Sequence, residues 1–423
     1  MNFESFNLNT KINAGVKSLG FTVPTPIQEQ AIPPILEGCD VMGLAQTGTG
    51  KTAAFVLPIL QRLMAGPRKS VRSLIIAPTR ELTEQTNTAI KRLGGKTGLR
   101  GMSIYGGVSI RPQISTLQKG VDIVSACPGR LLDHINRGTI DVSNVEVLVL
   151  DEADQMFDMG FLPDIKKIIK RLPAERQTLL FSATMPKDIR RLATDVLQDP
   201  VKVQIGHTAP AETVAHTFYA VTMRKKIDLL HKLLNSTSTG SVLVFTRTKM
   251  RSKRVAQQLE KSGYEATALH GNLSQNKRQQ ALDGFRKGRH KILVATDVAA
   301  RGIDVRAVSH VINYDMPDTV DAYTHRIGRT GRACETGDAF TFVTSEDKEL
   351  LHGIEKVLGA NVKLCKLEGF YGPEPESDVP KSKPKQRSGG YRSTPDKNTK
   401  PRRRTRPKSN RRFSQARPRP AAA

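Results

Sequence analysis

The sequence predicts an α/β protein built from two tandem parallel-sheet domains, followed by a basic C-terminal tail. Three observations predict this class. Short apolar runs alternate with helical patterns, this alternation is interrupted near residues 206–211 and then resumes, and apolar residues become scarce after about Gly372. Runs that are apolar throughout are typical of strands buried on both faces, as in parallel sheets covered by helices. At 423 residues the chain is also longer than one core usually supports.

Each predicted strand is a short apolar run bounded by turn or helix signals. In the first half the runs are Asp40–Leu44, Ser73–Ala77, Val121–Ser125, Val145–Leu150 and Thr178–Phe181. In the second half they are Ser241–Phe245, Ala266–Leu269, Lys291–Ala295, Val308–Asn313 and Ala339–Val343. We therefore expect one domain at 1–206, a second at 207–371 and a tail at 372–423.

The net charge of +26 is concentrated in the predicted tail, where residues 381–419 hold 16 Lys or Arg and one acid, Asp396. Such a segment cannot bury enough apolar surface to offset its ordering entropy, so we expect it to be disordered. The excess of positive charge points to a polyanionic partner, most simply nucleic acid. An anionic membrane surface is the competing interpretation, but no amphipathic basic helix supports it.

Cysteine usage and the N-terminus indicate a cellular compartment. The cysteines Cys39, Cys127, Cys334 and Cys365 are far apart and have no metal-ligand spacing, which is typical of free thiols in a reducing compartment. The N-terminus has no basic region followed by an apolar stretch, and no apolar run is long enough to span a bilayer. We expect a soluble, cytoplasmic protein that does not bind membranes.

A glycine-rich stretch after the first predicted strand, Ala-Gln-Thr-Gly-Thr-Gly-Lys-Thr, has the form of a phosphate-binding P-loop. Its glycines let backbone N–H groups approach phosphate oxygens at the start of a helix. The lysine is expected to reach the β- and γ-phosphates, and the last threonine to bind Mg²⁺. The strict pattern has Gly where this chain has Ala45, so a structural turn is the alternative. The predicted nucleotide-loop residues are Thr47, Gly48, Thr49, Gly50, Lys51 and Thr52.

Two adjacent carboxylates follow the strand Val145–Leu150, at the end of the strand where ligands bind in open α/β sheets. Asp151 is expected to hold Mg²⁺, largely through water, and Glu152 to polarise the water that attacks a nucleoside triphosphate. Acid pairs are also common as solvated turns or helix caps. The P-loop upstream makes the catalytic interpretation the stronger one.

Ser182 and Thr184 follow the next predicted strand and have two interpretations. Their hydroxyls either cap the next helix or bond to Asp154 and link the nucleotide site to the rest of the domain.

Three arginines, Arg326, Arg329 and Arg332, recur at a spacing of three in the second half. They require a polyanion or several carboxylates, and a solvated basic helix is the alternative. If the two domains close on ATP, Arg329 and Arg332 can place a guanidinium on the γ-phosphate. Asp297 and Asp304 follow a strand and either accept from a ribose hydroxyl or form caps and ion pairs.

In their order along the chain, the P-loop, Asp-Glu-Ala-Asp, Ser-Ala-Thr and His-Arg-Ile-Gly-Arg-Thr-Gly-Arg resemble the motifs of the DEAD-box ATP-dependent RNA helicases. The resemblance covers roughly residues 3–365, and the ordered set is highly specific. A short N-terminus and a basic tail are most similar to the bacterial RhlE branch. The resemblance implies two RecA-like domains, ATP and Mg²⁺ as cofactors, and RNA as the partner.

The resemblance also assigns roles that the residues alone do not. Gly-Phe-Thr-Val-Pro-Thr-Pro-Ile-Gln matches the adenine-reading Q motif, so Gln28 is expected to hydrogen-bond the adenine edge. Phe21 would lie near the base, with Phe3 as the matching upstream aromatic residue. Asp304 fits a ribose contact, and His325 fits a link between the second domain and the ATP site.

RNA-backbone contacts are likewise implied by the resemblance, and such contacts carry no sequence information. In the first domain they are Pro78, Thr79, Arg80, Gly106, Gly107, Gly129 and Arg130. In the second domain they are Arg247, Gly271, Gln275, Arg278 and Thr296. This chain departs from the family at Thr83, Cys127 and Gln155, where Ala, Thr and Arg are usual. Cys127 removes a hydroxyl that can touch a phosphate.

The function predicted from these features is an RNA-dependent ATPase that separates short RNA duplexes locally and without processivity. We expect a monomer that binds single-stranded and short duplex RNA without sequence preference. The family suggests ribosome assembly or RNA remodelling and decay as settings, with ribosomal precursors or decay machinery as partners. Two alternatives are a DNA-directed P-loop motor and a non-enzymatic RNA-annealing chaperone that relies on the basic tail.

Overall fold

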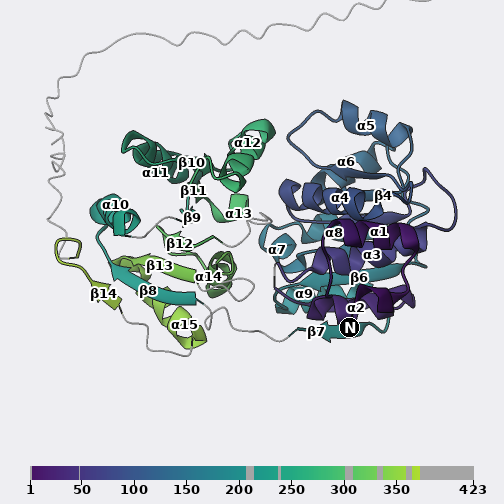
Figure 1. The fold of residues 1–423 in the computed structure, drawn as a ribbon, viewed down its shortest axis with the longest axis horizontal. Helices are drawn as coiled ribbons and strands as arrows, with labels where there is room; N and C mark the ends of the chain where they lie inside the picture. Colours follow the sequence, from purple (N-terminus) through teal and green to yellow (C-terminus); the bar gives the residue numbers. More distant parts are fainter. Residues whose placement is uncertain are drawn as a thin grey trace, which may run out of the picture. The chain divides into compact units, whose positions relative to one another are not determined.

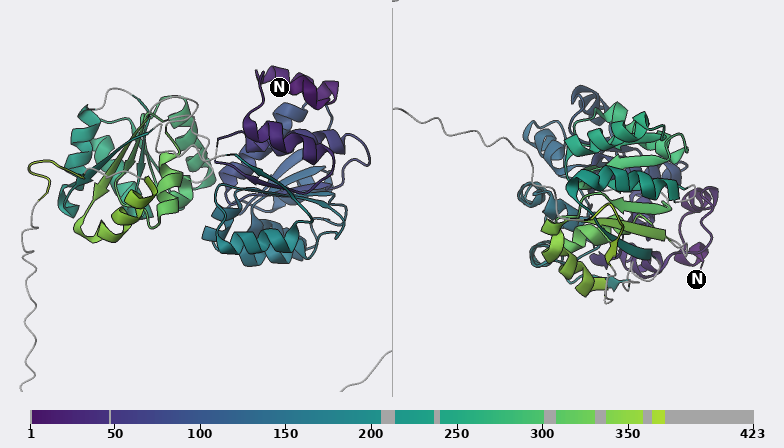
Figure 2. Two further views of the ribbon diagram at one scale, coloured as in Figure 1. Left: turned by 90° about the horizontal axis from the view of Figure 1, so that it is seen from below. Right: turned by 90° about the vertical axis from the view of Figure 1, so that its left-hand side faces the viewer.

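The structure is a computed structural model that describes residues 2–46, 48–205, 214–236, 240–300, 308–330, 337–358 and 364–371. In these residues the chain forms two seven-stranded sheets in which all neighbouring strands are parallel (Figure 1). Helices lie on both faces of each sheet (Figure 2). The predicted fold class, two tandem α/β parallel-sheet domains, is therefore confirmed.

The first sheet, taken over the described strands, has the order β3-β4-β2-β5-β6-β1-β7. Its strands are β1 (Val41–Leu44), β2 (Ser73–Ile76), β3 (Gly101–Ile104), β4 (Ile123–Ala126), β5 (Val147–Leu150), β6 (Gln177–Ser182) and β7 (Val201–Gln204). Its helices are η1 (Phe3–Phe6), α1 (Thr10–Ser18), α2 (Pro26–Leu36), α3 (Lys51–Leu63), α4 (Arg80–Gly94), α5 (Arg111–Gln118), α6 (Pro128–Asn136), α7 (Ala153–Asp158), α8 (Leu162–Ile169) and α9 (Lys187–Val196).

The second sheet, again over the described strands, has the order β10-β11-β9-β12-β13-β8-β14. Its strands are β8 (Val214–Ala220), β9 (Val242–Phe245), β10 (Ala266–Leu269), β11 (Ile292–Ala295), β12 (His310–Asn313), β13 (Gly337–Val343) and β14 (Leu364–Lys366). Its helices are η2 (Met223–Lys225), α10 (Lys226–Ser236), α11 (Lys249–Lys261), α12 (Gln275–Arg286), α13 (Asp297–Ala300), α14 (Val320–Ile327), η3 (Ser345–Asp347) and α15 (Lys348–Leu358).

The central strand β5 is buried on both faces, and this fixes the position of the acids that follow it. Val147 and Val149 belong to the core shared with α2 and α3, whereas Leu148 and Leu150 belong to the core shared with α6 and α8. Successive side chains of a strand point to opposite faces, which explains this division. Because β5 is held from both sides, the chain after Leu150 leaves the sheet at a well-defined point of its carboxyl edge.

Helices α11 and α12 cover opposite faces of the second sheet. Val255 and Leu259 of α11 pack in the core that contains Val244, whereas Leu282 of α12 packs in the core that contains Leu243. Val244 and Leu243 are successive residues of β9, so their side chains point to opposite faces. The edge strand β10 therefore lies at the border between these two helices (Figure 1).

The predicted apolar runs correspond to β1, β2, β4, β5, β6 and the five strands from β9 to β13. Four strands were not predicted, and they lie at or next to sheet edges: β3, β7, β8 and β14. An edge strand is covered on fewer sides and needs no continuous apolar run. In β7, Val-Lys-Val-Gln, Val203 is the buried residue and the others are exposed.

Several predictions fall partly or wholly on residues outside the described ranges. The linker near 206–211 and the tail at 372–423 lie outside these ranges. The expected disorder of the tail and the limits of the two domains therefore stay predictions. Among the described residues, no helix combines the length and the apolar character that crossing a bilayer requires.

Candidate nucleotide and nucleic-acid site

The loop between β1 and α3 requires glycine at the start of the helix. Gly50 is the N-cap of α3 and has a φ of 97°, a left-handed conformation that L side chains rarely adopt. A Cβ added at this position would lie 2.5 Å from Nε2 of Gln28, so the space is closed as well. No side chain caps α3, which leaves the N–H groups of its first turn for an anion.

Lys51 and the two acids form a buried charged group at the ends of β1 and β5. The Nζ of Lys51 donates to the backbone oxygen of Ala45 at 2.7 Å, and Lys51 is only 6% exposed. Asp151 and Glu152 are each 2% exposed. Burial raises the pKa of both carboxyls, and Lys51 opposes this rise. Such perturbed carboxyls beside a phosphate-type loop are typical of a catalytic site.

The same residues fit a magnesium ion that is shared with a nucleotide. The Oδ1 of Asp151 is buried and has no hydrogen-bond partner among the described residues, and such an orphaned oxygen suits a cation or its bound water. Thr52 is half-buried at the second position of α3. Mg²⁺ is usually held by one or two side chains together with phosphate oxygens and waters.

Glu152 has an unusual backbone conformation that the sequence did not predict. Its φ is 52° and its ψ is 53°, which places a non-glycine residue in the left-handed region at the N-cap of α7. This conformation costs of order 1 to 3 kcal/mol and persists only where the surrounding structure enforces it. Here the completely buried β5 and the helix α7 enforce it, and the side chain is thereby fixed beside Lys51 and Asp151.

Asp154 joins the acidic motif to Ser182 and Thr184. Its Oδ2 accepts from the backbone N–H groups of Ala183 and Thr184, at 3.2 and 2.9 Å, and from the Thr184 hydroxyl at 3.2 Å. Ser182 accepts from the N–H of Asp154 and donates to the backbone oxygen of Thr184. The alternative in which these hydroxyls cap the next helix is wrong, because α9 begins at Lys187 after Pro186.

A histidine of the helix α14, in the second half of the chain, also lies beside Asp154. The Nε2 of His325 is 3.7 Å from Oδ2 of Asp154, and both side chains are largely buried. One carboxylate therefore contacts the end of β6 and the helix α14.

The predicted adenine-reading residues are placed close to the nucleotide loop. The Nε2 of Gln28 donates to the backbone oxygen of Gly50 at 3.1 Å, and its Oε1 accepts from the N–H of Thr25 at 2.9 Å. Gln28 thus connects the N-terminus of α2 to the start of α3. Phe21 is 38% exposed and stacks on Phe3, with ring centroids 6.0 Å apart.

The three arginines of the second half differ in their surroundings. Arg326 is completely buried, forms an ion pair with Asp297 and lies over the ring of Phe245. The ion-pair interpretation of Asp297 is therefore confirmed. Arg329 is 3% exposed and lines a small cavity with His325. Three predicted site residues lie outside the described ranges: Thr47, Asp304 and Arg332.

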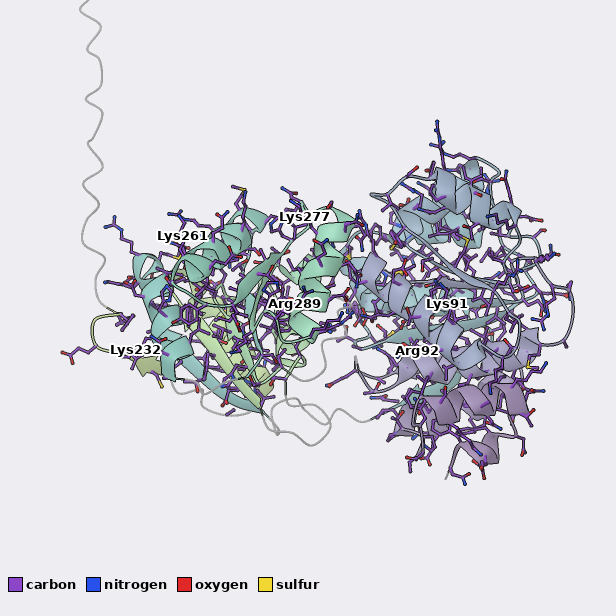
Figure 3. All side chains as sticks on the ribbon, turned by 45° about the horizontal axis from the view of Figure 1, so that its top comes forward. Lys91, Arg92, Lys232, Lys261, Lys277 and Arg289 are labelled. Carbon is purple, nitrogen blue, oxygen red and sulfur yellow. The ribbon has the colours of Figure 1, made fainter. Side chains whose placement is uncertain are left out.

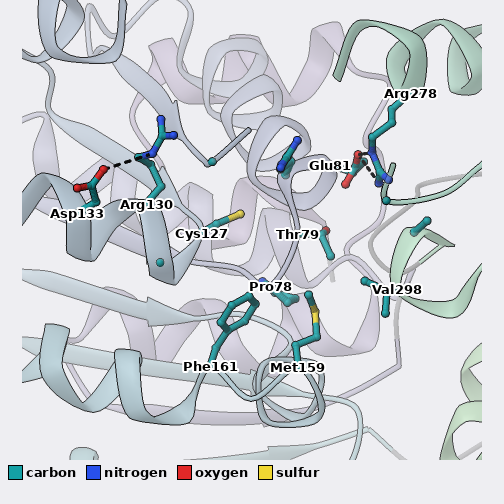
Figure 4. A pocket seen from close by; sticks show the side chains of 15 residues that line it. Pro78, Thr79, Glu81, Cys127, Arg130, Asp133, Met159, Phe161, Arg278 and Val298 are labelled. Atoms are coloured by element: carbon teal, nitrogen blue, oxygen red, sulfur yellow. Dashed lines mark hydrogen bonds and ion pairs between the residues drawn. The ribbon is translucent and has the colours of Figure 1, made fainter. Parts of the chain in front are cut away.

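A cavity of about 490 Å³ gathers most of the predicted RNA contacts (Figure 4). The predicted residues that line it are Pro78, Thr79, Arg80, Gly106, Gly129, Arg130, Gly271 and Arg278. Gln275 joins them indirectly, because its side chain accepts from Arg80 at 3.3 Å. Gly107, Arg247 and Thr296 do not line this cavity. Thr79 also has a structural role, since its hydroxyl caps α4.

Several side chains of this cavity had no predicted role. Glu81 accepts from Nε of Arg278 at 2.7 Å, and both side chains are at most 8% exposed (Figure 4). Met159, Phe161 and Val298 add an apolar wall. Glu81 lies within the stretch Pro78–Leu82 that resembles the family's RNA contacts, but no individual role was predicted for it. The apolar residues carry no signal in the sequence, because they are brought together only by the fold.

Asp315 orders the residues around Arg247. Its carboxylate accepts from the backbone N–H of Arg247 and from the side chains of Lys226 and Arg251, at 2.7 to 3.0 Å. Burial alone raises the pKa of Asp315, but Lys226 and the Arg247 N–H outweigh burial and hold it below the usual value. The position of Arg247 therefore depends on a buried carboxylate that the sequence did not single out.

Cys127 occupies the N-cap position of α6 without capping it. Its Sγ lies 3.4 Å from the Thr83 hydroxyl, which itself donates to the backbone oxygen of Thr79. Burial raises the pKa of the Cys127 thiol to about 11, so it stays protonated at neutral pH.

Replacing Cys127 by Thr is expected to increase the free energy of unfolding by about 1 kcal/mol, because threonine supplies the missing N-cap acceptor. Urea unfolding of the full chain measures the change. Cys127→Ala is the matched control that removes the sulfur without adding a hydroxyl. Equal stability of the Thr and Ala variants would contradict the assignment of position 127 as an unsatisfied cap.

Comparison with known proteins identifies the family. The DEAD/DEAH box helicase family matches residues 25–192, and the helicase conserved C-terminal domain matches residues 225–334. The CshA DEAD-box ATP-dependent RNA helicase of Bacillus subtilis is 45% identical over 356 residues, which are 84% of this chain and 72% of that protein. This chain belongs to the DEAD-box ATP-dependent RNA helicases. It is therefore an RNA helicase and ATPase.

Other relatives agree with this assignment. The DEAD-box helicase RhpA of Helicobacter pylori is 43% identical over 367 residues, which are 86% of this chain and 74% of RhpA. Among solved structures, S. cerevisiae Dbp5 bound to RNA and ADP BeF3 is 30% identical, with a TM-score of 0.75, over 86% of this chain and 95% of that one. Mss116p bound to ssRNA and AMP-PNP is 28% identical, with a TM-score of 0.78, over 88% of this chain and 79% of that one. These likenesses identify both sheets as RecA-like domains.

Proposed function

We propose that this DEAD-box helicase couples RNA-stimulated ATP hydrolysis to local, non-processive separation of short RNA duplexes. The observation that carries the proposal is the set of contacts around Asp154. One buried carboxylate touches the Ser182–Thr184 segment of the first domain and His325 of the second. A shift of the acidic motif when ATP binds or is hydrolysed would therefore change contacts in both domains. Coupling between the ATP site and the RNA site requires such shared contacts.

In this proposal the first domain holds the nucleotide. Phe21 and Gln28 read the adenine, and the P-loop from Thr47 to Thr52 holds the phosphates. Thr52 and Asp151 hold Mg²⁺, largely through water, and the ion supplies charge neutralisation of the phosphates. Glu152 accepts the proton of the attacking water. Three residues complete the site from the second domain: Arg329, Arg332 and Asp304, with the two arginines on the γ-phosphate and Asp304 on the ribose.

RNA is proposed to bind across both domains and to favour the same closed arrangement as ATP. The cavity formed by residues of both RecA-like domains supports this, as does the Glu81–Arg278 pair. Two ligands that favour one state must raise each other's affinity. Closure around one strand forces a bend that a duplex cannot follow, and loss of phosphate reopens the cleft and releases RNA. ATP then acts mainly as a switch.

Strand-separation assays test the local, non-processive mode. With ATP, a duplex of about one helical turn is expected to separate rapidly, and a duplex of about three turns with identical ends only very slowly. The reason is that each additional stacked step adds to the free energy of separation, while a local action supplies a fixed amount. Equal rates for both lengths would contradict non-processive action and indicate a translocating motor.

The basic tail is proposed to tether structured RNA by electrostatic contacts without sequence preference. Deleting residues 381–419, which hold 16 Lys or Arg, is expected to flatten the salt dependence of RNA binding. The relevant slope is that of the logarithm of the binding constant against the logarithm of the salt concentration. Its magnitude falls by about 0.7 for each lost phosphate contact to single strands and by about 0.9 for each on duplex DNA. Basal ATPase is expected to stay unchanged. A slope that survives the deletion would show that the tail is only a solvated extension.

An RNA-annealing chaperone is the second candidate, favoured by the charge of the tail. A tail-only peptide that anneals as well as the full chain would support it. We also propose membership of the RhlE branch, supported by the basic composition of residues 381–419. A role in ribosome assembly or RNA decay is proposed with it. A monomer in the cytoplasm is the proposed form. The free thiols of Cys39, Cys127 and Cys365 support the reducing compartment.

A further inference from the structure

The second domain contains a groove that is separate from the nucleotide site and larger than the RNA cavity. Its volume is about 810 Å³, and it is lined by α11, β10, the loop after β10, α12 and the segment that follows α12. Because α11 and α12 cover opposite faces of the sheet, the groove runs along the outer edge of β10. Small apolar side chains lie within it: Ala256, Ala268 and Ala281.

The strand β10 offers backbone hydrogen-bonding groups to this groove. Among the described strands it pairs with β11 alone. The carbonyls of Glu265 and Leu269 accept from the β11 side, from Ile292 and Thr296. Since successive residues of a strand turn these groups to alternate edges, the N–H and C=O of Ala268 point to the outer edge. An unpaired edge of this kind is a template for another strand.

The rim of the groove is strongly basic. Four exposed basic residues line it: Lys249, Lys253, Lys277 and Arg289. Among the described lining residues, Glu260 is the one acid. Figure 3 shows Lys277 and Arg289 on and just after α12. The Nδ1 of His270, also in the lining, is buried and has no hydrogen-bond partner among the described residues. The groove thus combines a strand edge, an unused polar atom and a ring of positive charge.

We propose that this groove binds an acidic, extended peptide segment of a protein partner, which adds to β10 as a further strand. Strand addition takes its affinity from main-chain hydrogen bonds and its specificity from alternate side chains. Asp and Glu side chains at alternate positions would meet the basic rim, and small residues between them would fill the space above Ala268.

An RNA strand fits these features less well. A sugar–phosphate chain does not present the evenly spaced N–H and C=O groups that pair with a strand edge. Binding of single-stranded RNA usually relies on aromatic side chains on which bases stack. Neither Phe, Tyr nor Trp is among the described residues that line the groove. Of the two imidazoles present, His270 is buried and His290 is half-buried, so neither offers an open stacking platform.

The test uses the full chain and a fluorescent eight-residue peptide in which Asp or Glu alternates with Thr or Val. Fluorescence anisotropy is expected to show binding that weakens about tenfold or more in the double variant Lys253→Glu, Arg289→Glu, because two favourable charges become repulsive. The matched control is Lys261→Glu, an exposed lysine of α11 outside the groove lining, and it is expected to bind normally. A peptide of the same composition with proline at its centre is expected to bind weakly, because it cannot complete the strand.

Hydrogen exchange at one amide supplies a readout that simple charge attraction would not change. Exchange of the Ala268 N–H is expected to slow when the peptide is added. The proposal is overturned if the alternating peptide does not bind at about 1 mM, if the double variant binds it normally, or if Ala268 exchanges at an unchanged rate. It is equally overturned if an oligouridylate, and not the peptide, loses affinity in the double variant, because the groove is then an RNA surface.

Discussion

Replacing Glu152 by Gln is expected to lower kcat for RNA-stimulated ATP hydrolysis by about 10²- to 10⁴-fold while ATP binding is retained. Glutamine has nearly the same shape but cannot accept the proton of the attacking water, and general bases contribute rate factors of this size. Glu152 is 2% exposed and is fixed by a left-handed backbone conformation beside Lys51 and Asp151. Phosphate release and binding of a fluorescent ATP analogue measure the two effects separately.

The matched control is Glu175→Gln, because Glu175 is an exposed acid of the same domain and is expected to leave the rate unchanged. A second signature is the pH dependence of kcat/KM for ATP. An ordinary glutamate has a pKa of about 4.3. Burial raises the pKa of Glu152, so its basic form is lost at a higher pH than this. The acid limb is therefore expected above that pH and is expected to disappear in the Gln variant. Near-normal turnover by Glu152→Gln would refute its assignment as the base.

Replacing Asp154 by Asn is expected to reduce RNA stimulation of the ATPase and duplex separation by about 5- to 150-fold, the usual range of coupling between two sites. The Oδ2 of Asp154 accepts three hydrogen bonds from Ala183 and Thr184. The other oxygen, Oδ1, accepts from the backbone N–H of Gln155 at 3.0 Å. An amide has one acceptor oxygen instead of two, so asparagine leaves at least one of these donors without its partner. The measurement is the ratio of ATPase rates with and without RNA, together with the rate of duplex separation.

Thr184→Val is the matched control, because it removes one of these bonds and leaves the carboxylate intact. It is expected to cause a clearly smaller loss. Binding of the ATP analogue, which uses the P-loop, is expected to persist in both variants and shows that the first domain is folded. Normal coupling in Asp154→Asn would show that the contacts around Asp154 are structural and do not transmit the state of the nucleotide.

The sequence predicted the central strands because their burial leaves a direct signature. Val147–Leu150 within the predicted run is apolar at every position, and the structure buries this strand, β5, on both faces. The edge strands gave no such signature. Gly101 opens β3, and β7 alternates two valines with Lys202 and Gln204. Such segments become strands because a neighbouring strand pairs with them. That neighbour is distant in the sequence, so the local sequence gives no sign of the pairing.

The candidate site was predictable where the local sequence carries the chemistry. Lys51 follows a glycine-rich loop and Asp151 follows a buried strand, so their meeting at one sheet edge follows from the fold class. The conformation of Glu152 and the role of Asp315 were not predictable, because both depend on tertiary contacts. Arg326 illustrates the same limit: it belongs to a spaced series of arginines, yet burial with Asp297 makes it part of the core.

The most direct test of the account is the steady-state rate of ATP hydrolysis by the full chain, measured with and without single-stranded RNA and with DNA of equal length. The account predicts stimulation of about tenfold or more by RNA and little by DNA, because RNA and ATP favour the same closed arrangement. A rate that is indifferent to RNA would contradict the coupling of the two domains on which the proposed function depends.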